Sequence, residues 1–242
     1  MKPRIEALEA IAFDLDGTLV DSAPDIRHAL NSALQKAGMR SFELEVVRGW
    51  IGDGPEATIA RAMAAQGIDP HDAPGRALLA HLRRGFDKTA LAAPLALGTV
   101  FDGIAALLAD LARQYRLVVV TNKPTPLARA LLDAARLLPF FGAVHGADRP
   151  EQRKPAPVLL NEAAARLGLD AGAPLLMVGD GRADLMAARA AGCPVALAGW
   201  GYGAEGWDGP APWRVGTPAE LRDALLPAMC TAVTTQNTLV HF

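Results

Sequence analysis

The chain has few cysteines, little net charge and no long hydrophobic run, and each shortage excludes a class of protein. Its 242 residues include two cysteines, Cys193 and Cys230, which are too few for a disulfide framework and form no metal-binding pair. Idle thiols of this kind are typical of a reducing compartment. The formal net charge of −2 gives no overall attraction to nucleic acid or to an acidic membrane.

The hydrophobic pattern also argues against a membrane protein. No apolar run approaches the ~18 residues that a membrane-spanning helix needs. The basic N-terminus, Met1 to Glu6, is not followed by the long apolar core of a signal peptide. With 51% hydrophobic and 21% charged residues, the composition is that of a globular protein. We therefore expect a cytoplasmic protein that binds neither membrane nor nucleic acid, as a monomer or a homodimer.

The stretch from Ile11 to Leu19 joins an apolar run to a pair of carboxylates. Residues 9–13 read as a fully buried parallel strand, and Asp14 and Asp16 follow it directly. Carboxylates are costly to bury unless a cation or hydrogen-bond donors meet them, and ligands of open α/β sheets bind at the carboxyl ends of strands. The stretch predicts a divalent-metal or phosphate site. An EF-hand is excluded because Gly17 is fourth in the loop, not sixth.

Strand and helix patterns alternate along most of the chain, which predicts an α/β fold with a doubly wound, Rossmann-like parallel sheet. After the first strand, further strands are expected at 117–120, 143–146, 175–179 and 194–198. Helices are expected at 23–37, 42–48, 55–66, 72–91, 102–114, 126–135, 157–167, 184–191 and 218–226. Asp21 or Ser22 is expected to cap the first helix and Thr217 the last. No strand pattern interrupts residues 38–92, so an all-helical domain is inserted after the first strand.

Polar groups of complementary kinds follow the predicted strands, and the tips of parallel strands lie at one edge of a sheet. They are Asp14 and Asp16, Thr121 and Asn122 with Lys123, Lys154, and Asp180 with Asp184. Several carboxylates repel one another without a cation, and Mg²⁺ prefers carboxylate, water and phosphate oxygens. A lysine and a threonine hydroxyl suit a phosphoryl group. Together these residues indicate metal-assisted phosphoryl transfer.

Each signal alone has a simpler interpretation. An Asp-x-Asp pair also occurs in turns and in glycosyltransferase metal motifs, and Thr121-Asn122 at a strand end also caps helices. Lys154 alone would be a solvated loop lysine, and Asp180 with Asp184 would be a capped helix start. The order of the signals at successive strand ends favours the site.

The four motifs together resemble those of the haloacid dehalogenase superfamily. They are Asp14-Leu-Asp16-Gly-Thr18, Thr121-Asn-Lys, Lys154-Pro and Gly179-Asp180-x-x-x-Asp184. The resemblance covers about residues 9–200, and the helical insert is similar to that superfamily's α-helical cap. Further segments resemble the bacterial phosphoglycolate phosphatase branch: residues 13–22, Trp50-Ile-Gly-Asp-Gly54, Val120 to Pro124, Lys154-Pro-Ala-Pro157 and Gly201-Tyr-Gly203.

The resemblance implies a phosphatase with Mg²⁺ as cofactor. Asp14 would attack phosphorus and form an aspartyl-phosphate, and Asp16 would act as the acid and base. Thr121 and the backbone near Asp16 and Asn122 would bind the phosphoryl group, and Lys154 would offset its charge. The metal ligands would be Asp14, Asp180 and the backbone carbonyl of Asp16, with Asp184 as a water-mediated ligand or an outer support.

The resemblance also implies a division into domains. A Rossmann-like core would comprise residues 1–20 and 94–228, a helical cap residues 21–93, and a C-terminal tail residues 229–242. The tail is interpreted as a loosely held end. The chain departs from the family where a proline-glycine pair is usual and Leu97-Gly98 stands instead. That position lies in the return from the cap, so the change is expected to alter cap motion.

Substrate choice is expected to depend on the cap, which would close over the site and exclude water. Arg48 is a candidate partner for a substrate carboxylate, with a solvated helix-end arginine as the alternative. Gly52 and Gly54 would allow close backbone approach to a ligand, unless they form a plain turn. The expected partner is a small phosphorylated metabolite, 2-phosphoglycolate first. A sugar phosphate, such as N-acetylmuramate 6-phosphate or a hexose phosphate, pyrophosphate, or a non-catalytic Mg²⁺ or phosphate-binding role remain open.

Overall fold

A parallel sheet organises the larger part of the molecule in this computed structural model, which describes residues 8–169, 175–203 and 212–226. Among these residues the sheet has six strands in the order β5-β4-β1-β6-β7-β8, and every neighbouring pair is parallel. The strands are β1 (Ala10–Phe13), β4 (Arg116–Thr121), β5 (Ala143–Gly146), β6 (Leu175–Gly179), β7 (Val195–Ala198) and β8 (Trp213–Val215).

The order of the strands reverses beside β1. The chain adds β4 and β5 on one side of β1 and then returns to add β6, β7 and β8 on the other. Phe13, the last residue of β1, lies opposite Val119 of β4 and Val178 of β6. A crevice forms where the strand order reverses in such a sheet, beyond the carboxyl ends of the strands. The segments that follow β1 and β6 therefore meet at this crevice.

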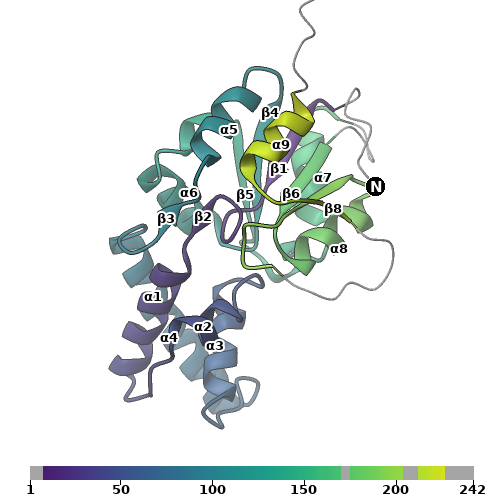
Figure 1. Ribbon diagram of the computed structural model, residues 1–242. Coiled ribbons are helices and arrows are strands. Elements are labelled where there is room, and N and C mark those ends of the chain that lie inside the picture. The colour runs from purple at the N-terminus through teal and green to yellow at the C-terminus, as the bar shows by residue number, and fades with distance from the viewer. Residues whose placement is uncertain (1–7, 170–174, 204–211, 227–242) are drawn as a thin grey trace, which may run out of the picture.

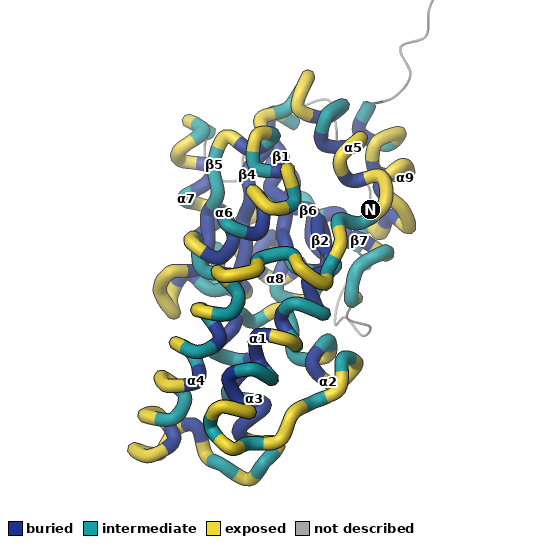
Figure 2. Tube along the Cα trace, turned by 90° about the vertical axis from the view of Figure 1, so that its left-hand side faces the viewer, coloured by how far each residue is buried: buried dark blue, intermediate teal, exposed yellow. Residues whose placement is uncertain are grey.

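Helices cover both faces of the sheet (Figure 1). One face packs against α5 (Ile104–Leu111), α6 (Thr125–Ala134) and α9 (Pro218–Leu225), and the other against α7 (Val158–Arg166) and α8 (Arg182–Ala191). Alternate residues of β1 face opposite ways: Ile11 and Phe13 join the first core, and Ala10 and Ala12 the second. Short 3₁₀ turns lie at Leu138–Phe140 and Pro150–Gln152. The central strands are buried throughout (Figure 2).

A separate group of helices lies below the sheet in Figure 1. It consists of α1 (Ala23–Lys36), α2 (Leu44–Arg48), α3 (Pro55–Ala64) and α4 (Ala73–Ala92). These four helices bury a hydrophobic cluster of their own, which includes Leu30, Ile59 and Phe86. Leu127 of α6 belongs to the same cluster, so the helical group also packs against the helix that follows β4.

Two short strands connect the helical group to the sheet. β2 (Val20–Asp21) and β3 (Thr99–Val100) pair in an antiparallel manner. Beside them, the Asp25 carboxylate accepts hydrogen bonds from the backbone N–H groups of Ala96, Leu97 and Gly98, at 2.7–2.9 Å. A proline at position 97 would have no N–H to donate. The departure at Leu97-Gly98 therefore adds a hydrogen bond to the return connection.

The structure confirms the predicted fold class, and each predicted helix and strand is present with small shifts at its ends. Sequence analysis missed β2, β3 and β8, which are two or three residues long and too short to show a periodicity. Thr217 caps α9 by accepting a hydrogen bond from the Glu220 N–H. Ser22 occupies the N-cap position of α1, but its hydroxyl donates to Asp16 instead.

Some expectations lie outside the described residues, namely those on Cys230 and the tail of residues 229–242. Over the described ranges, none of the helices combines the length and the apolar character that crossing a membrane requires.

Candidate active site

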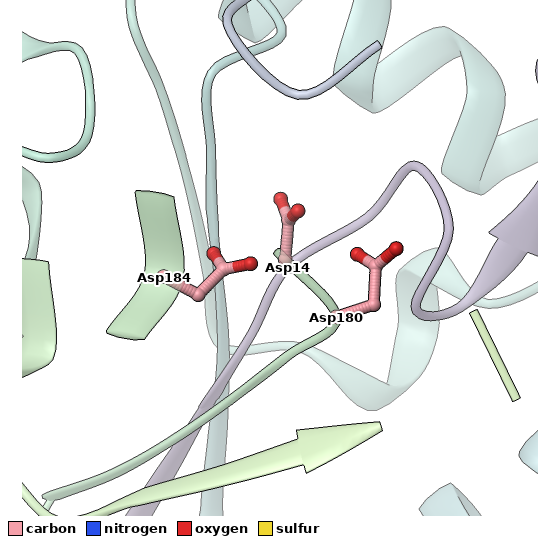
Figure 3. Close-up of side chains that lie close together, drawn as sticks. All are labelled: Asp14, Asp180 and Asp184. Carbon is pink, nitrogen blue, oxygen red and sulfur yellow. The ribbon is translucent and has the colours of Figure 1, made fainter. Parts of the chain in front are cut away.

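Three carboxylates meet at the crevice beside β1. Asp14 follows β1, Asp180 follows β6, and Asp184 lies in the first turn of α8. One oxygen from each lies within 4.8 Å of the other two, and all three residues are buried (Figure 3). The chain places them there because β1 and β6 are neighbours and end at the same level: the Asp14 N–H donates to the Val178 carbonyl at 2.8 Å.

Lys154 supplies a positive charge at the base of this cluster. Its ammonium lies 2.9 Å from Asp14 Oδ1 and 2.5 Å from Asp184 Oδ1, and it donates to the Val120 carbonyl at 3.0 Å. Burial by itself lowers the pKa of this ammonium, but the carboxylates of Asp14 and Asp184 outweigh it and raise the pKa. The ammonium has three N–H donors; two of them go to Val120 and Asp184, and its contact with Asp14 is an ion pair.

The cluster retains an excess of negative charge. Burial raises the pKa of Asp14 to about 6, against the opposing charge of Lys154. Burial, followed by the charges of Asp184 and Asp14, raises the pKa of Asp180 to about 7. When all three carboxylates are ionised, the single ammonium leaves two negative charges for a divalent cation to offset.

The oxygen atoms of the cluster differ in how they are occupied. Asp14 Oδ1 is buried and accepts no hydrogen bond of good geometry, although the Lys154 charge is close. Asp180 accepts from the Thr18 hydroxyl at 3.1 Å and from the Tyr202 N–H at 2.8 Å, both neutral donors. Asp184 accepts from Lys154 and from the Gly181 N–H at 3.0 Å. An orphaned carboxylate oxygen among carboxylates fits a hard cation such as Mg²⁺.

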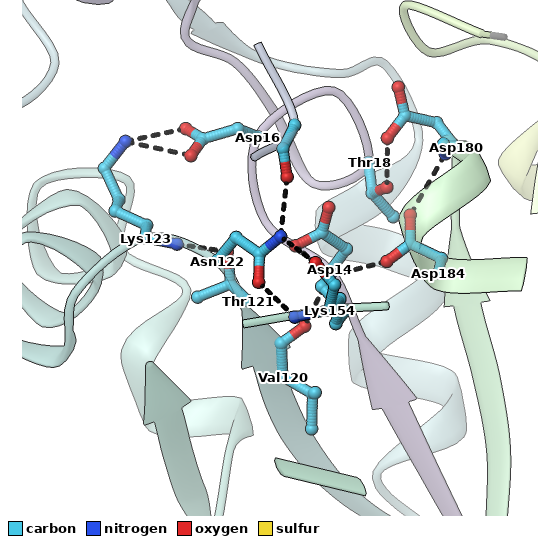
Figure 4. Close-up of polar contacts among 12 residues, drawn as sticks. Asp14, Asp16, Thr18, Val120, Thr121, Asn122, Lys123, Lys154, Asp180 and Asp184 are labelled. Atoms are coloured by element: carbon cyan, nitrogen blue, oxygen red, sulfur yellow. Dashed lines mark hydrogen bonds and ion pairs between the residues drawn. The ribbon is translucent and has the colours of Figure 1, made fainter. Parts of the chain in front are cut away.

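Asp16 lies apart from this cluster (Figure 4). The Lys123 ammonium donates to both of its carboxylate oxygens, at 2.8 and 3.0 Å, and the Ser22 hydroxyl donates to Oδ1. The two carboxylates of the Asp14-Leu15-Asp16 segment are therefore held by different cations. Gly17 permits the turn: its φ is +85°, and a Cβ atom there would lie 2.5 Å from Asp180 Oδ2.

Thr121 and Asn122 lie beside Asp14 at the end of β4. Thr121 is buried, and its hydroxyl oxygen accepts from the Lys123 N–H at 3.2 Å, which leaves its own hydrogen free to be donated. The Asn122 side chain instead connects segments. It accepts from the Lys154 N–H at 2.7 Å and donates to the Lys154 and Gly52 carbonyls at 3.0 and 2.8 Å.

The loop between α2 and α3 lies over these strand ends and meets the site at two hollows. The first, called the acidic cleft, has a volume of about 220 Å³ and is lined by residues that include Asp14, Asp180, Asp184, Arg48, Arg182 and Tyr202. The second, called the apolar pocket, has a volume of about 20 Å³. Its lining includes Asp14, Asp16, Lys123, Ile26, Ile51 and Phe86.

The three loop residues singled out from the sequence contact different neighbours. Arg48 lines the acidic cleft, pairs with Glu45 at 2.6 Å, and lies 5.9 Å from the centre of the Tyr202 ring. A Cβ atom on Gly54 would lie 2.8 Å from the Asn122 carbonyl oxygen, whereas Gly52 has no atom that close. Gly54 therefore allows a close approach between the helical group and the β4 tip.

Sequence reasoning placed Lys123 among the polar groups at the strand tips without naming its partner, and it gave no role to the side chains of Thr18 and Tyr202. The Lys123 ammonium donates to both carboxylate oxygens of Asp16, and the Thr18 hydroxyl donates to the Asp180 carboxylate. The Tyr202 hydroxyl donates to Asp21 and accepts from the Ala23 N–H, both at 2.9 Å. The available signals were the placement of Lys123 two residues after Thr121 and a tyrosine between two glycines after a strand.

Comparison with known proteins agrees with this geometry. A haloacid dehalogenase-like hydrolase family model matches residues 8–192. The phosphoglycolate phosphatase of Yersinia pseudotuberculosis is 37% identical over 200 residues, which are 82% of this chain and 84% of that protein. A plasmid phosphoglycolate phosphatase of Cupriavidus necator is 41% identical over 226 residues, which are 92% of this chain and 93% of that protein.

A solved structure is similar over most of the chain. The crystal structure of a predicted phosphoglycolate phosphatase from Haemophilus somnus has a TM-score of 0.76 and 27% sequence identity, and the match covers 88% of this chain and 96% of that one. These comparisons confirm the resemblance that the four motifs indicated.

Proposed function

The chain belongs to the haloacid dehalogenase-like hydrolase family and is a phosphatase, and we propose that it hydrolyses 2-phosphoglycolate with Mg²⁺ through an aspartyl-phosphate. The observation that carries the proposal is the arrangement around Asp14. The buried Asp14 carboxylate has an oxygen without a hydrogen bond and lies beside Asp180, Asp184 and the Lys154 ammonium. Thr121 lines the same pocket as Asp14. The names of the similar proteins support the choice of substrate.

In the first step an oxygen of Asp14 forms a bond to phosphorus while the bond to the leaving oxygen breaks. Asp16 gives its proton to that leaving oxygen. In the second step Asp16 takes a proton from water, the water oxygen bonds to phosphorus, and the bond to Asp14 breaks. The separation of the Asp16 side chain from the carboxylate cluster supports this division of roles.

The remaining groups hold the phosphoryl oxygens and their charge. The Thr121 hydroxyl and the backbone near Asp16 and Asn122 donate to them, and Lys154 offsets the charge that gathers at Asp14. Arg48, Gly52 and Gly54 form the part of a helical cap, residues 21–93, that faces the substrate. Residues 1–20 and 94–228 form the catalytic core in this proposal.

Asp14, Asp180 and the backbone carbonyl of Asp16 would hold the metal. When bound, Mg²⁺ would withdraw charge from the phosphoryl group and fix its orientation. Asp184 would support Lys154 or reach the metal through water, since its oxygens accept from the Lys154 ammonium and from the Gly181 N–H, whereas the donors to Asp180 are neutral.

A substrate panel with Mg²⁺ tests the proposal, with kcat/KM compared for 2-phosphoglycolate, sugar phosphates and pyrophosphate. We expect 2-phosphoglycolate to rank first and Asp14→Asn to lower kcat by about 10⁴-fold or more. Circular dichroism of the variant serves as the control for folding. A sugar phosphate in first place would refute the substrate, and full activity of Asp14→Asn would refute the mechanism.

A further inference from the structure

In the proposed mechanism the leaving oxygen of a substrate has to reach the Asp16 carboxylate. Asp16 lines both hollows, but of the two only the apolar pocket is also lined by Lys123, the cation that contacts Asp16. The lining also includes the apolar residues Ile26, Ile51, Pro55 and Phe86 and the polar residues Thr58, Thr121 and Asn122. Its volume of about 20 Å³ favours a small leaving group over a large one.

Lys123 is the one cation among the described residues that line this pocket. Its side chain is 9% exposed, and that of Asp16 is 13% exposed. The ammonium has three N–H donors, and the Asp16 oxygens take two of them. Among the described residues, no acceptor other than Asp16 lies within hydrogen-bond distance of the Lys123 ammonium, so its third N–H is without a partner.

The nearby carboxylate does not take up this N–H donor, and the other cations of the site do not replace Lys123 in the apolar pocket. The Asp25 carboxylate lines another hollow that Lys123 also lines, but its oxygens accept three backbone N–H groups. Lys154 contacts Asp14, Asp184 and Val120, and Arg48, which donates one N–H to Glu45, lines the acidic cleft and not the apolar pocket. Lys123 is thus the cation with a donor to spare next to the leaving-group position.

We propose that Lys123 selects the substrate by binding its carboxylate. In such a substrate, a small 2-phosphorylated hydroxy acid, the carboxylate is bonded to the carbon that carries the phosphate ester oxygen. This inference rests on the proposed function and names the residue that recognises the carboxylate of the leaving group. A buried donor left without a partner is costly, so a leaving group without an acceptor there is disfavoured. The small size of the pocket and the apolar part of its wall disfavour a sugar, since hydroxyls placed against Ile26, Ile51 or Phe86 would be buried without partners.

The test compares two substrates that differ only at the proposed contact: 2-phosphoglycolate and 2-hydroxyethyl phosphate. The measured quantity is the ratio of their kcat/KM values. We expect Lys123→Met to lower this ratio by about tenfold or more, as the loss of a charge-assisted hydrogen bond predicts. Lys123→Arg, which keeps the charge, should restore part of the ratio. Lys36→Met, which removes an exposed lysine, should leave the ratio unchanged.

Lys123 also holds Asp16, so a loss of activity alone would not support the proposal. If Lys123→Met lowers both kcat/KM values by the same factor, Lys123 only positions Asp16 and the proposal is wrong. If Arg48→Met lowers the ratio and Lys123→Met does not, the carboxylate binds at the acidic cleft and the proposal is also wrong. Failure of the proposed function is separate, because the wild-type protein would then show no preference for 2-phosphoglycolate.

A second readout does not depend on turnover. In the Asp14→Asn background, calorimetry with Mg²⁺ measures the dissociation constants of the same two phosphate esters. We expect the added Lys123→Met substitution to weaken binding of 2-phosphoglycolate about tenfold more than binding of 2-hydroxyethyl phosphate. Equal weakening would overturn the proposal even if the activity of the variant were too low to measure.

Discussion

The two sides of Asp14 are built in different ways. On the side of the acidic cleft, Asp180, Asp184 and Lys154 are buried and held by several donors or acceptors each. On the side of the apolar pocket, the contacts come from α1, α4 and the α2–α3 loop, which lines both hollows, and from one pair, Lys123 with Asp16. The first side offers fixed charges to a phosphoryl group, and the second offers a small shaped space. The difference suggests that chemistry and substrate choice reside in separate parts of the chain.

The largest expected effect tests the fixed side. Lys154→Met should lower kcat by about 10²–10³-fold, because it removes a preorganised charge from the site. It should also lower the free energy of unfolding by about 3–5 kcal/mol, since Asp14 and Asp184 would be left buried without their cation. Kinetics and urea unfolding measure the two effects. Lys88→Met, which removes an exposed lysine, is the control, and a stable Lys154→Met protein would contradict this view of the cluster.

The pH dependence of stability tests the same cluster without any substrate. The pKa of Asp14 is about 6 and that of Asp180 about 7 in the folded state, and both exceed the unfolded value of 3.8. A raised carboxyl pKa means that folding takes up protons, so the stabilisation is complete below about pH 4 and is lost as the pH rises through 6 to 7. The metal-free protein should therefore lose stability over this range, by an amount on the order of a few kcal/mol.

Thermal or urea unfolding from pH 4 to 8, with chelator and with Mg²⁺, measures this loss. Bound Mg²⁺ should reduce it, because a cation stabilises the charged carboxylates. Asp180→Asn should flatten the curve of the metal-free protein. An unchanged curve in that variant would show that Asp180 does not titrate as described.

A matched pair of glycine substitutions tests the loop side. Gly54→Ala should lower kcat/KM by about tenfold, because its Cβ would press on the Asn122 carbonyl and displace the loop. Gly52→Ala meets no atom within 4 Å and carries only the strain of its φ of +125°, so its effect should be smaller. Steady-state kinetics give the kcat/KM values of both variants for this comparison. A larger effect at Gly52 would mean that contact with Asn122 does not set the loop position.

The smallest expected effect concerns the link between the two sides. Tyr202→Phe removes the hydroxyl that joins Asp21 and the Ala23 N–H but keeps the ring beside Arg48. The Tyr202 N–H to Asp180 also remains. We expect a change of about two- to fivefold in KM with little change in kcat, as the loss of one or two neutral hydrogen bonds at a connection predicts. A large loss of kcat would place Tyr202 in the chemistry itself.

Much of the fold followed from local patterns. The apolar run before Asp14, the β-branched run at 117–120 and the helical spacing of residues 23–37 each correspond to an element of the structure. These signals are strong because buried parallel strands and amphipathic helices need long, regular patterns. Strands β2, β3 and β8 lacked that length, and their pairing depends on distant partners.

The sequence by itself determined which residue types stand at the strand ends, because buried charge chemistry tolerates few substitutes at Asp14, Lys154 and Asp180. Only the tertiary structure decided how those charges divide. In the folded chain Lys154 pairs with Asp14 and Asp184, and Lys123 pairs with Asp16. The Asn122 side chain donates to the carbonyls of Gly52 and Lys154. The Lys123–Asp16 pair joins residues 107 positions apart, and no local pattern encodes which distant partner a side chain meets when the strands assemble.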